Sequence, residues 1–184
     1  MAGMTVMAPS DERERLLMAA TAVELDEGPI ALRYPRGNGL GLDLPAEGQV
    51  LEIGRGRMIR EMGRQSGAQT GGIAILSLGP RLGACLQAAD MLAARGLPPT
   101  VADARFARPT AKALVENLAR NHAPLITIEK GPERGLGTQV RHPLVPTAPL
   151  DPLRLRPTPL PARCTVHITH TARYDECWRS PPHH

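Results

Sequence analysis

The sequence of 184 residues contains very few aromatic side chains. Aromatic residues make up 2% of the chain, whereas 42% of its residues are hydrophobic. The aromatic residues are Tyr34, Phe106, Tyr174 and Trp178. A globular core must therefore consist mainly of Leu, Ile, Val, Ala and Met, which bury less area per side chain. The shortage also argues against a protein that stacks nucleic-acid bases on aromatic side chains.

Cysteine is scarce as well. Cys85, Cys164 and Cys177 are an odd number of residues at unrelated spacings, with no CxxC pair. This pattern argues against both a disulfide framework and a structural zinc site, so we expect no metal. Cys85 lies on the apolar face of an expected helix, and we interpret it as a small core residue.

Long apolar runs are absent. No run approaches the roughly 20 residues that a membrane-spanning helix needs. The first ten residues already include polar ones, unlike the start of a secretory signal. We therefore expect a cytoplasmic protein with no membrane partner.

The positive charge is confined to one end of the chain. The net charge is +4 and the pI is about 9.4. Residues 1–129 hold 14 basic and 14 acidic side chains, whereas residues 130–184 hold eight basic and four acidic ones. A nucleic-acid-binding module is expected to carry a basic stripe on its folded part. We therefore expect no nucleic-acid partner.

The most informative motif is ALRYPRGN at residues 31–38, which places Arg33 and Arg36 three residues apart around Pro35. Residues 29–32 form an expected buried strand, which Pro35 ends. A guanidinium group binds a phosphate or carboxylate at two points, and Gly37 lets the backbone come close. The motif therefore suits an anion, although a surface arginine in an ordinary ion pair is the alternative.

Around this motif the pattern predicts a strand–helix–strand unit. Residues 4–7 form the first strand, and Ser10 and Asp11 begin a helix over residues 11–26 with acidic residues in its first turn. The expected apolar stripe of this helix is Leu16, Leu17, Ala19, Ala20 and Val23. Two strands and one helix cannot bury both faces of a sheet, so the unit should pack against another part of the chain.

The rest of the chain predicts an α/β fold with a doubly wound, mostly parallel sheet. Strands alternate with helices over short connections, which is typical of a right-handed layered structure. The expected strands are residues 50–53, 57–60, 73–78, 100–104 and 125–129, and the expected helices are residues 81–95, ended by Gly96, and 110–120, capped by Thr110. We expect residues 37–48 to form a linker and residues 62–72 a flexible loop.

Several polar residues have both a functional and a structural interpretation. Glu129, at the carboxyl end of a strand, lies where α/β sheets often bind ligands, but a helix cap or an interface partner is the favoured role. We expect Asp103 and Arg105 to pair locally. His122, at the end of a helix, is better explained as a cap than as a catalytic base.

Five sequence blocks together resemble a known family. Residues 3–12, the RYPRG block, and residues 73–79, 101–106 and 125–129 are similar, in order and spacing, to the carboxy-terminal part of 1-deoxy-D-xylulose-5-phosphate synthase. That enzyme is a thiamine-diphosphate enzyme of the transketolase group. The resemblance covers about residues 3–140.

The resemblance implies a function and a site. The family condenses pyruvate, with decarboxylation, with glyceraldehyde 3-phosphate in isoprenoid and thiamine precursor synthesis, and its enzymes are homodimers. It implies that Arg36, with Arg33, binds the substrate phosphate. It implies thiamine diphosphate and Mg as cofactors, held by family segments that precede the counterpart of Gly3. We therefore expect no catalytic residue, no cofactor and no activity for this chain alone.

The resemblance also implies a domain organisation. Residues 1–47 correspond to the end of a pyrimidine-binding domain, and residues 48–140 to the transketolase carboxy-terminal domain, which serves packing and subunit contact. Gly135 to Gly137 correspond to the glycine turn into the last family helix, with Arg134 where the family prefers another glycine.

Residues 141–184 form an expected tail rich in Pro and Arg. Seven prolines lie between residues 143 and 161, and such a segment should be extended and disordered. A proline-rich ligand for an SH3-like module is one alternative. A second alternative is that the tail is read in a wrong frame, which is lost near residue 130 and regained about 40 residues later. The return to the frame is suggested by Tyr174 to Glu176, which resemble the family again.

Three functional hypotheses remain open from the sequence. The chain is a truncated or frame-damaged synthase portion, a split subunit that completes a thiamine-diphosphate enzyme with a partner chain, or a non-catalytic α/β interaction module. The split-subunit hypothesis predicts an exposed apolar face around Val6, Leu16 and Leu32.

Overall fold

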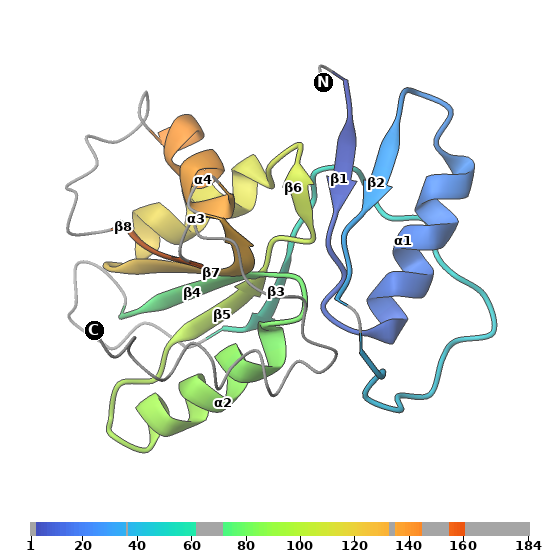
Figure 1. The fold of residues 1–184 in the computed structure, drawn as a ribbon. Coiled ribbons are helices and arrows are strands. Elements are labelled where there is room, and N and C mark those ends of the chain that lie inside the picture. The colour runs from blue at the N-terminus through green and yellow to red at the C-terminus, as the bar shows by residue number, and fades with distance from the viewer. Residues whose placement is uncertain (1–2, 36, 62–71, 133–134, 145–154, 161–184) are drawn as a thin grey trace, which may run out of the picture.

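The computed structural model describes residues 3–35, 37–61, 72–132, 135–144 and 155–160. These residues form two sheets and four helices (Figure 1). In chain order the elements are β1 (Thr5–Met7), α1 (Glu12–Glu24), β2 (Ile30–Leu32), β3 (Arg57–Arg60), β4 (Ala74–Leu78), α2 (Leu82–Ala93), β5 (Thr100–Asp103), β6 (Phe106–Arg108), α3 (Lys112–Asn121), β7 (Leu125–Pro132), α4 (Leu136–Leu144) and β8 (Leu155–Leu160).

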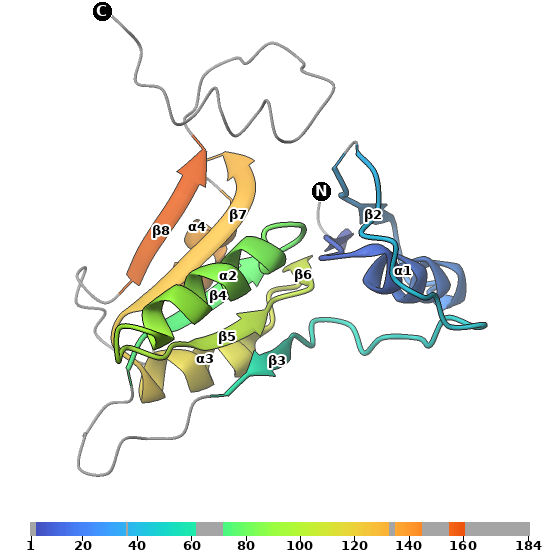
Figure 2. The same cartoon turned by 90° about the horizontal axis from the view of Figure 1, so that it is seen from below.

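The main sheet has the strand order β3-β5-β4-β7-β8. Strand β4 pairs in parallel with β5 and β7, β8 is parallel to β7, and β3 is antiparallel to β5. Helix α2 lies on one face of this sheet, and α3 and α4 lie on the other (Figures 1 and 2). The expected doubly wound α/β fold is therefore confirmed.

Alternation of side chains along the central strands supplies a core on both faces of the main sheet. Leu76 and Leu78 of β4 pack in the same cluster as residues of α3 and α4, whereas Ile75 packs in the cluster of α2. Successive residues of a strand point to opposite faces, so a run of apolar residues is what a strand covered on both sides requires. This pattern made β4 predictable from the sequence.

Helix α2 ends at Ala93, and Gly96 closes the turn that follows it, as expected. The φ of Gly96, +76°, lies in the left-handed region, which glycine adopts without steric cost. The backbone N–H of Leu97 donates to the carbonyl of Leu92, and that of Gly96 donates to Ala93. The last turn of the helix is therefore closed by main-chain hydrogen bonds.

The small sheet has the order β2-β1-β6, and β6 was not predicted from the sequence. Strand β1 pairs in parallel with β2 and antiparallel with β6. Between β5 and β6, Arg105 has a φ of +58°, and there the chain passes from the main sheet to the small one. Phe106 of β6 packs with Met7 and Met18 in the core of the small sheet. The expectation that the strand–helix–strand unit packs against another part of the chain is confirmed.

The expected apolar stripe of α1 was wrong. The buried residues of this helix are Glu14, Met18 and Thr21, whereas Val23 is 81% exposed. The buried face was not recognised because two of its three residues are polar. Thr21 is buried with its hydroxyl bonded, since it accepts a hydrogen bond from the Leu51 N–H at 2.8 Å.

Two local predictions in the middle of the chain were also wrong. Residues 50–53 form no strand, and Leu51 and Ile53 instead pack as irregular chain against the core of the small sheet. Thr110 makes no side-chain cap on α3, and its hydroxyl lies 3.3 Å from Oε1 of Gln139. The loop expected at residues 62–72 lies outside the described residues except for Gly72.

Part of the expected disordered tail is ordered. Helix α4 continues to Leu144, and β8 adds to the edge of the main sheet. Proline lacks a backbone N–H donor. An edge strand, however, pairs with a neighbouring strand on one side only, so its other side needs no donors. Pro157 and Pro159 are two residues apart and therefore lie on the same side of β8. The prediction of disorder was wrong for residues 141–144 and 155–160. Residues 145–154 and 161–184 lie outside the described residues.

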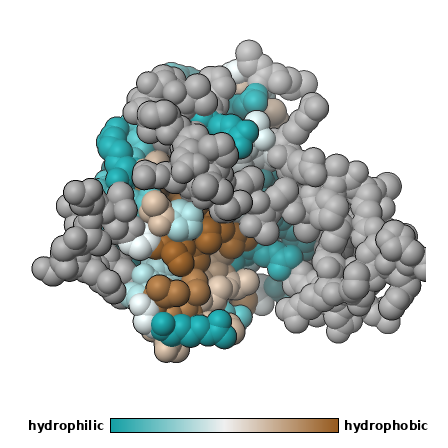
Figure 3. Space-filling model, turned by 90° about the vertical axis from the view of Figure 1, so that its left-hand side faces the viewer, coloured by the Kyte–Doolittle hydropathy of each residue, from teal (hydrophilic) through white to brown (hydrophobic). Residues whose placement is uncertain are grey.

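The main domain, which we define as residues 57–160 and which contains the main sheet with α2, α3 and α4, has a surface of mixed character. Figure 3, which shows the left-hand side of Figure 1, has hydrophobic side chains gathered in one area and hydrophilic ones around it. Among the described residues of the main domain, the exposed large hydrophobic side chains are Met91 and Leu97. Within the described segments, no helix has the length and apolar character needed to cross a membrane.

Candidate anion-binding site

The candidate site is the arginine segment, residues 33–37, which follows β2. At its start the backbone N–H of Arg33 donates to the carbonyl of Met7 at 2.8 Å. The Arg33 side chain reaches the main sheet, where Nη2 donates to Oε2 of Glu129 at 3.2 Å and to the Lys130 carbonyl at 3.3 Å. The start of the arginine segment is therefore attached to both sheets.

Arg36, the other residue expected to bind substrate, lies outside the described residues. Its role stays a prediction.

The chain that follows the arginine segment is attached to the beginning of α1. Oε1 of Glu12 accepts a hydrogen bond from the Leu42 N–H at 2.8 Å, and Nε of Arg13 donates to the Asp43 carbonyl at 2.7 Å. The backbone N–H of Leu42, and next that of Leu40, lower the pKa of Glu12 from 4.5 to about 2. Side chains therefore hold the polypeptide both before and after Arg36.

Glu129 also caps the last described helix. Its Oε1 accepts a hydrogen bond from the backbone N–H of Leu136, the first residue of α4. A Cβ atom at Gly135 would overlap the Glu129 carboxylate, so glycine is required at this turn. The interpretation of Glu129 as a helix cap and interface partner is confirmed, and the glycine turn into α4 forms although Arg134 departs from the family pattern.

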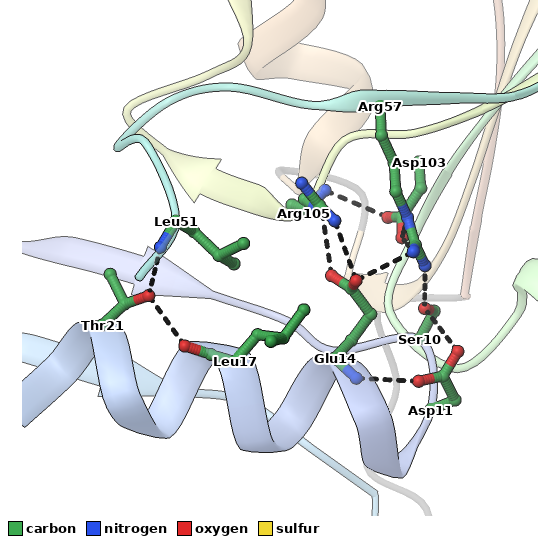
Figure 4. A network of polar contacts seen from close by, with 9 residues as sticks. All are labelled: Ser10, Asp11, Glu14, Leu17, Thr21, Leu51, Arg57, Asp103 and Arg105. Carbon is green, nitrogen blue, oxygen red and sulfur yellow. Dashed lines mark hydrogen bonds and ion pairs between the residues drawn. The ribbon is translucent and has the colours of Figure 1, made fainter. Parts of the chain in front are cut away.

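A second polar cluster joins α1 to the main domain (Figure 4). The Glu14 side chain is only 2% exposed. Its Oε2 accepts a hydrogen bond from Nε of Arg105 at 2.8 Å, and its Oε1 forms an ion pair with Nη1 of Arg57 at 2.8 Å. Arg57 also reaches Oδ2 of Asp103 at 3.3 Å and the Ser10 hydroxyl at 3.1 Å. One buried carboxylate of the small unit thus holds two guanidinium groups of the main domain.

The predicted local pair of Asp103 and Arg105 exists only through the backbone. The backbone N–H of Arg105 donates a hydrogen bond to Oδ1 of Asp103 at 3.0 Å, while the guanidinium of Arg105 donates to the carboxylate of Glu14. Burial raises the pKa of the Asp103 carboxyl, and the Arg105 N–H and the Arg57 guanidinium act in the opposite direction. Sequence reasoning missed the roles of Glu14 and Arg57, because their partners are distant along the chain.

His122 and Cys85 have the structural roles expected of them. Nδ1 of His122 lies 3.1 Å from the Leu118 carbonyl at the end of α3, and Nε2 lies 2.9 Å from the Thr100 hydroxyl. Cys85 is 1% exposed in the cluster between α2 and the main sheet, and burial raises the pKa of its thiol. A raised thiol pKa makes this cysteine a poor nucleophile.

The fold and the site define a class of protein. The chain is an α/β domain with a mostly parallel sheet, and ion pairs of the buried Glu14 carboxylate join this sheet to the unit of β1, α1 and β2. Arg33 follows β2, and a guanidinium group is suited to binding an anionic group. The chain belongs to the transketolase C-terminal domain family, which matches residues 68–161.

The family match extends the likeness beyond the range expected from the sequence. It continues about 20 residues past Val140, through α4 and β8. A match that continues through residue 161 argues against a reading frame lost near residue 130.

Two solved transketolase structures share the fold. One, described as "Split gene transketolase, inactive beta4 tetramer", is 23% identical with a TM-score of 0.69, and the match covers 95% of this chain and 52% of that chain. The transketolase of Campylobacter jejuni is 20% identical with a TM-score of 0.50, and the match covers 70% and 19%. The chain therefore spans about half the length of the split-gene protein.

We expect the hydrogen bonds of Glu12 to give a defined pH dependence of stability. The unfolded carboxyl takes up a proton near its ordinary pKa of 4.5, whereas the folded one stays charged down to about 2. The stabilisation by Glu12 is therefore present above pH 4.5 and lost as the pH falls from 4.5 towards 2. The difference in urea midpoint between the native chain and Glu12→Gln should shrink between about pH 6 and about pH 3.

Glu24→Gln is the matched control for this experiment. Glu24 is exposed in the last turn of the same helix and controls for the loss of one negative charge. The lowered pKa of Glu12 would be contradicted if the difference in urea midpoint between the native chain and Glu12→Gln stayed constant with pH. It would also be contradicted if Glu24→Gln showed the same pH dependence.

Proposed function

We propose that this chain is the carboxy-terminal portion of a thiamine-diphosphate enzyme of the 1-deoxy-D-xylulose-5-phosphate synthase kind. That enzyme condenses pyruvate, with loss of carbon dioxide, with glyceraldehyde 3-phosphate. In this proposal Arg36 and Arg33 bind the phosphate of the aldehyde substrate, and the main domain packs against the rest of the enzyme. The family membership and the five similar sequence blocks support it.

One observation carries the proposal, namely that the arginine segment is held in place on both sides. Arg33 is bonded to Glu129 before Arg36, and residues 42 and 43 are bonded to the start of α1 after it. A guanidinium group binds a phosphate well only when its orientation is fixed, because two parallel hydrogen bonds are needed. A free surface turn would need no such attachments.

In this proposal the family segments that precede the counterpart of Gly3 hold the cofactor. When bound, thiamine diphosphate supplies the carbon nucleophile, and the residues of this chain would bind and orient the substrate that it attacks.

We further propose that the remaining segments are supplied by a partner chain. The similarity to a split-gene transketolase favours this arrangement. The face expected around Val6, Leu16 and Leu32 is half-buried, which corrects the position predicted for the contact. Among the described residues of the first 50, large hydrophobic side chains are exposed elsewhere, at Val23, Tyr34, Leu40, Leu42, Leu44 and Val50.

The proposal predicts a specific kinetic effect of Arg36→Ala. The chain would be combined with a polypeptide that carries the family segments preceding Gly3, and product formation from pyruvate and glyceraldehyde 3-phosphate would be measured. Loss of a charge-assisted phosphate contact should raise the KM for glyceraldehyde 3-phosphate about 10- to 100-fold. The KM for pyruvate should not change, because pyruvate has no phosphate.

Arg55→Ala is the control, since Arg55 is 73% exposed and pairs only with exposed Glu52 among the described residues. Equal effects of the two variants would contradict a role for Arg36 in phosphate binding. A combination that makes no deoxyxylulose phosphate but transfers a ketol group between sugar phosphates would show a transketolase of different specificity.

A further inference from the structure

Glu129 occupies a position between three parts of the fold. Glu129 itself lies in β7 of the main sheet. One of its carboxylate oxygens accepts a hydrogen bond from Nη2 of Arg33, and the other accepts a hydrogen bond from the backbone N–H of Leu136 in α4. Its side chain is 5% exposed. With both oxygens bonded and the side chain buried, the carboxylate has a fixed orientation.

The contact with Glu129 uses only one corner of the Arg33 guanidinium. Nη2 donates to Oε2 of Glu129 and to the Lys130 carbonyl, both on β7. No other described residue makes a hydrogen bond or ion pair with Nε or Nη1 of Arg33, and the side chain is 44% exposed. Among the described residues, the planar group is thus held at one corner and its other donors have no partner.

This arrangement differs from an ordinary surface ion pair. In a surface pair both side chains move, and the orientation of the guanidinium is poorly defined. Here the carboxylate is fixed by the main sheet and by α4, so it transmits a fixed orientation to an arginine that belongs to the small sheet. The two residues are 96 positions apart in the sequence.

We propose that Glu129 is a positioning residue for phosphate recognition, and that it acts by orienting Arg33 so that Nε and Nη1 face the anionic group of the substrate. The inference rests on the proposed function. It assigns Glu129 no contact with the substrate and no proton transfer.

The test uses Glu129→Gln in the enzyme assembled with the preceding family segments. Glutamine retains the size of the side chain and an oxygen that can accept the Leu136 N–H, but a neutral amide holds Arg33 less firmly. The KM for glyceraldehyde 3-phosphate should rise about three- to tenfold, while kcat and the KM for pyruvate stay the same. Glu52→Gln, which changes the exposed pair with Arg55, should have no effect.

A double-variant cycle separates positioning from general damage. If Glu129 acts through Arg33, then Glu129→Gln should add nothing to the KM in an Arg33→Ala background. The inference would be overturned if Glu129→Gln raised the KM for glyceraldehyde 3-phosphate equally in the native and the Arg33→Ala backgrounds. A change in kcat or in the KM for pyruvate would also overturn it.

A second readout uses the isolated chain and does not depend on the reaction. Amide hydrogen exchange at Arg33 and Tyr34 should be faster in Glu129→Gln than in the native chain, while exchange at Leu136 stays slow. Unchanged exchange at Arg33 and Tyr34 would overturn the inference. If the assembled native enzyme forms no product, the proposed function fails, and the exchange measurement still decides whether Glu129 holds Arg33.

Discussion

Replacement of Glu14 by alanine is expected to lower the free energy of unfolding by about 3 kcal/mol. The Glu14 side chain is 2% exposed, and Arg57 and Arg105, its two partners, are 30% and 17% exposed. Removal of the carboxylate leaves two guanidinium groups partly buried without their shared counterion. Breaking a buried ion pair by removing one partner is costly for this reason, whereas the pair itself contributes little net stability.

Urea denaturation of Glu14→Ala and Glu52→Ala provides the comparison. Glu52 and Arg55 form a pair that is 68% and 73% exposed, and its loss should change the free energy of unfolding by less than about 0.5 kcal/mol. Similar effects of the two substitutions would show that the cluster in Figure 4 does not hold α1 against the main domain.

Most of the main sheet, without β8, could be predicted from the sequence because its strands and helices carry local signals. The apolar run that forms β4 fits a strand buried on both faces, and α2 shows helical spacing up to Gly96. Cys85 and His122 were assigned correctly for the same reason, since their positions on a helix face and at a helix end are visible in the local pattern.

The parts that could not be predicted depend on partners far along the chain. Strand β6 has three residues and exists because β1, about 100 residues earlier, pairs with it. The buried face of α1 contains Glu14 and Thr21, which no hydrophobic pattern reveals. Strand β8 contains two prolines, which are tolerated at the sheet edge, and sequence alone does not show which strand lies there.

The candidate site could be anticipated only in part from the sequence. The spacing of Arg33 and Arg36 around Pro35 predicts an anion site, which stays a prediction, and Glu129 was interpreted as a helix cap or an interface partner. Their connection was not predicted, because the bond between Arg33 and Glu129 depends on how the small sheet packs on the main sheet. The chemistry of each residue was visible in the sequence, whereas their arrangement came from the tertiary fold.

Combination with the preceding family segments is expected to have a large effect on the activity of this chain. The isolated chain is expected to form no product from pyruvate and glyceraldehyde 3-phosphate, and to gain this activity when combined with the preceding family segments. The proposed division of labour gives the reason: this chain would bind the substrate phosphate and pack against its partner, and the preceding family segments would bind and ionise thiamine. A mixture that stays inactive, with both components folded, would contradict the split-subunit proposal.

Isothermal titration of the purified chain with thiamine diphosphate, in the presence and absence of Mg, tests the central claim most directly. The account predicts no saturable heat for the chain alone and saturable, Mg-dependent binding for the combination with the preceding segments. Saturable, Mg-dependent binding by the isolated chain would contradict it, because this polypeptide would then contain a complete cofactor site.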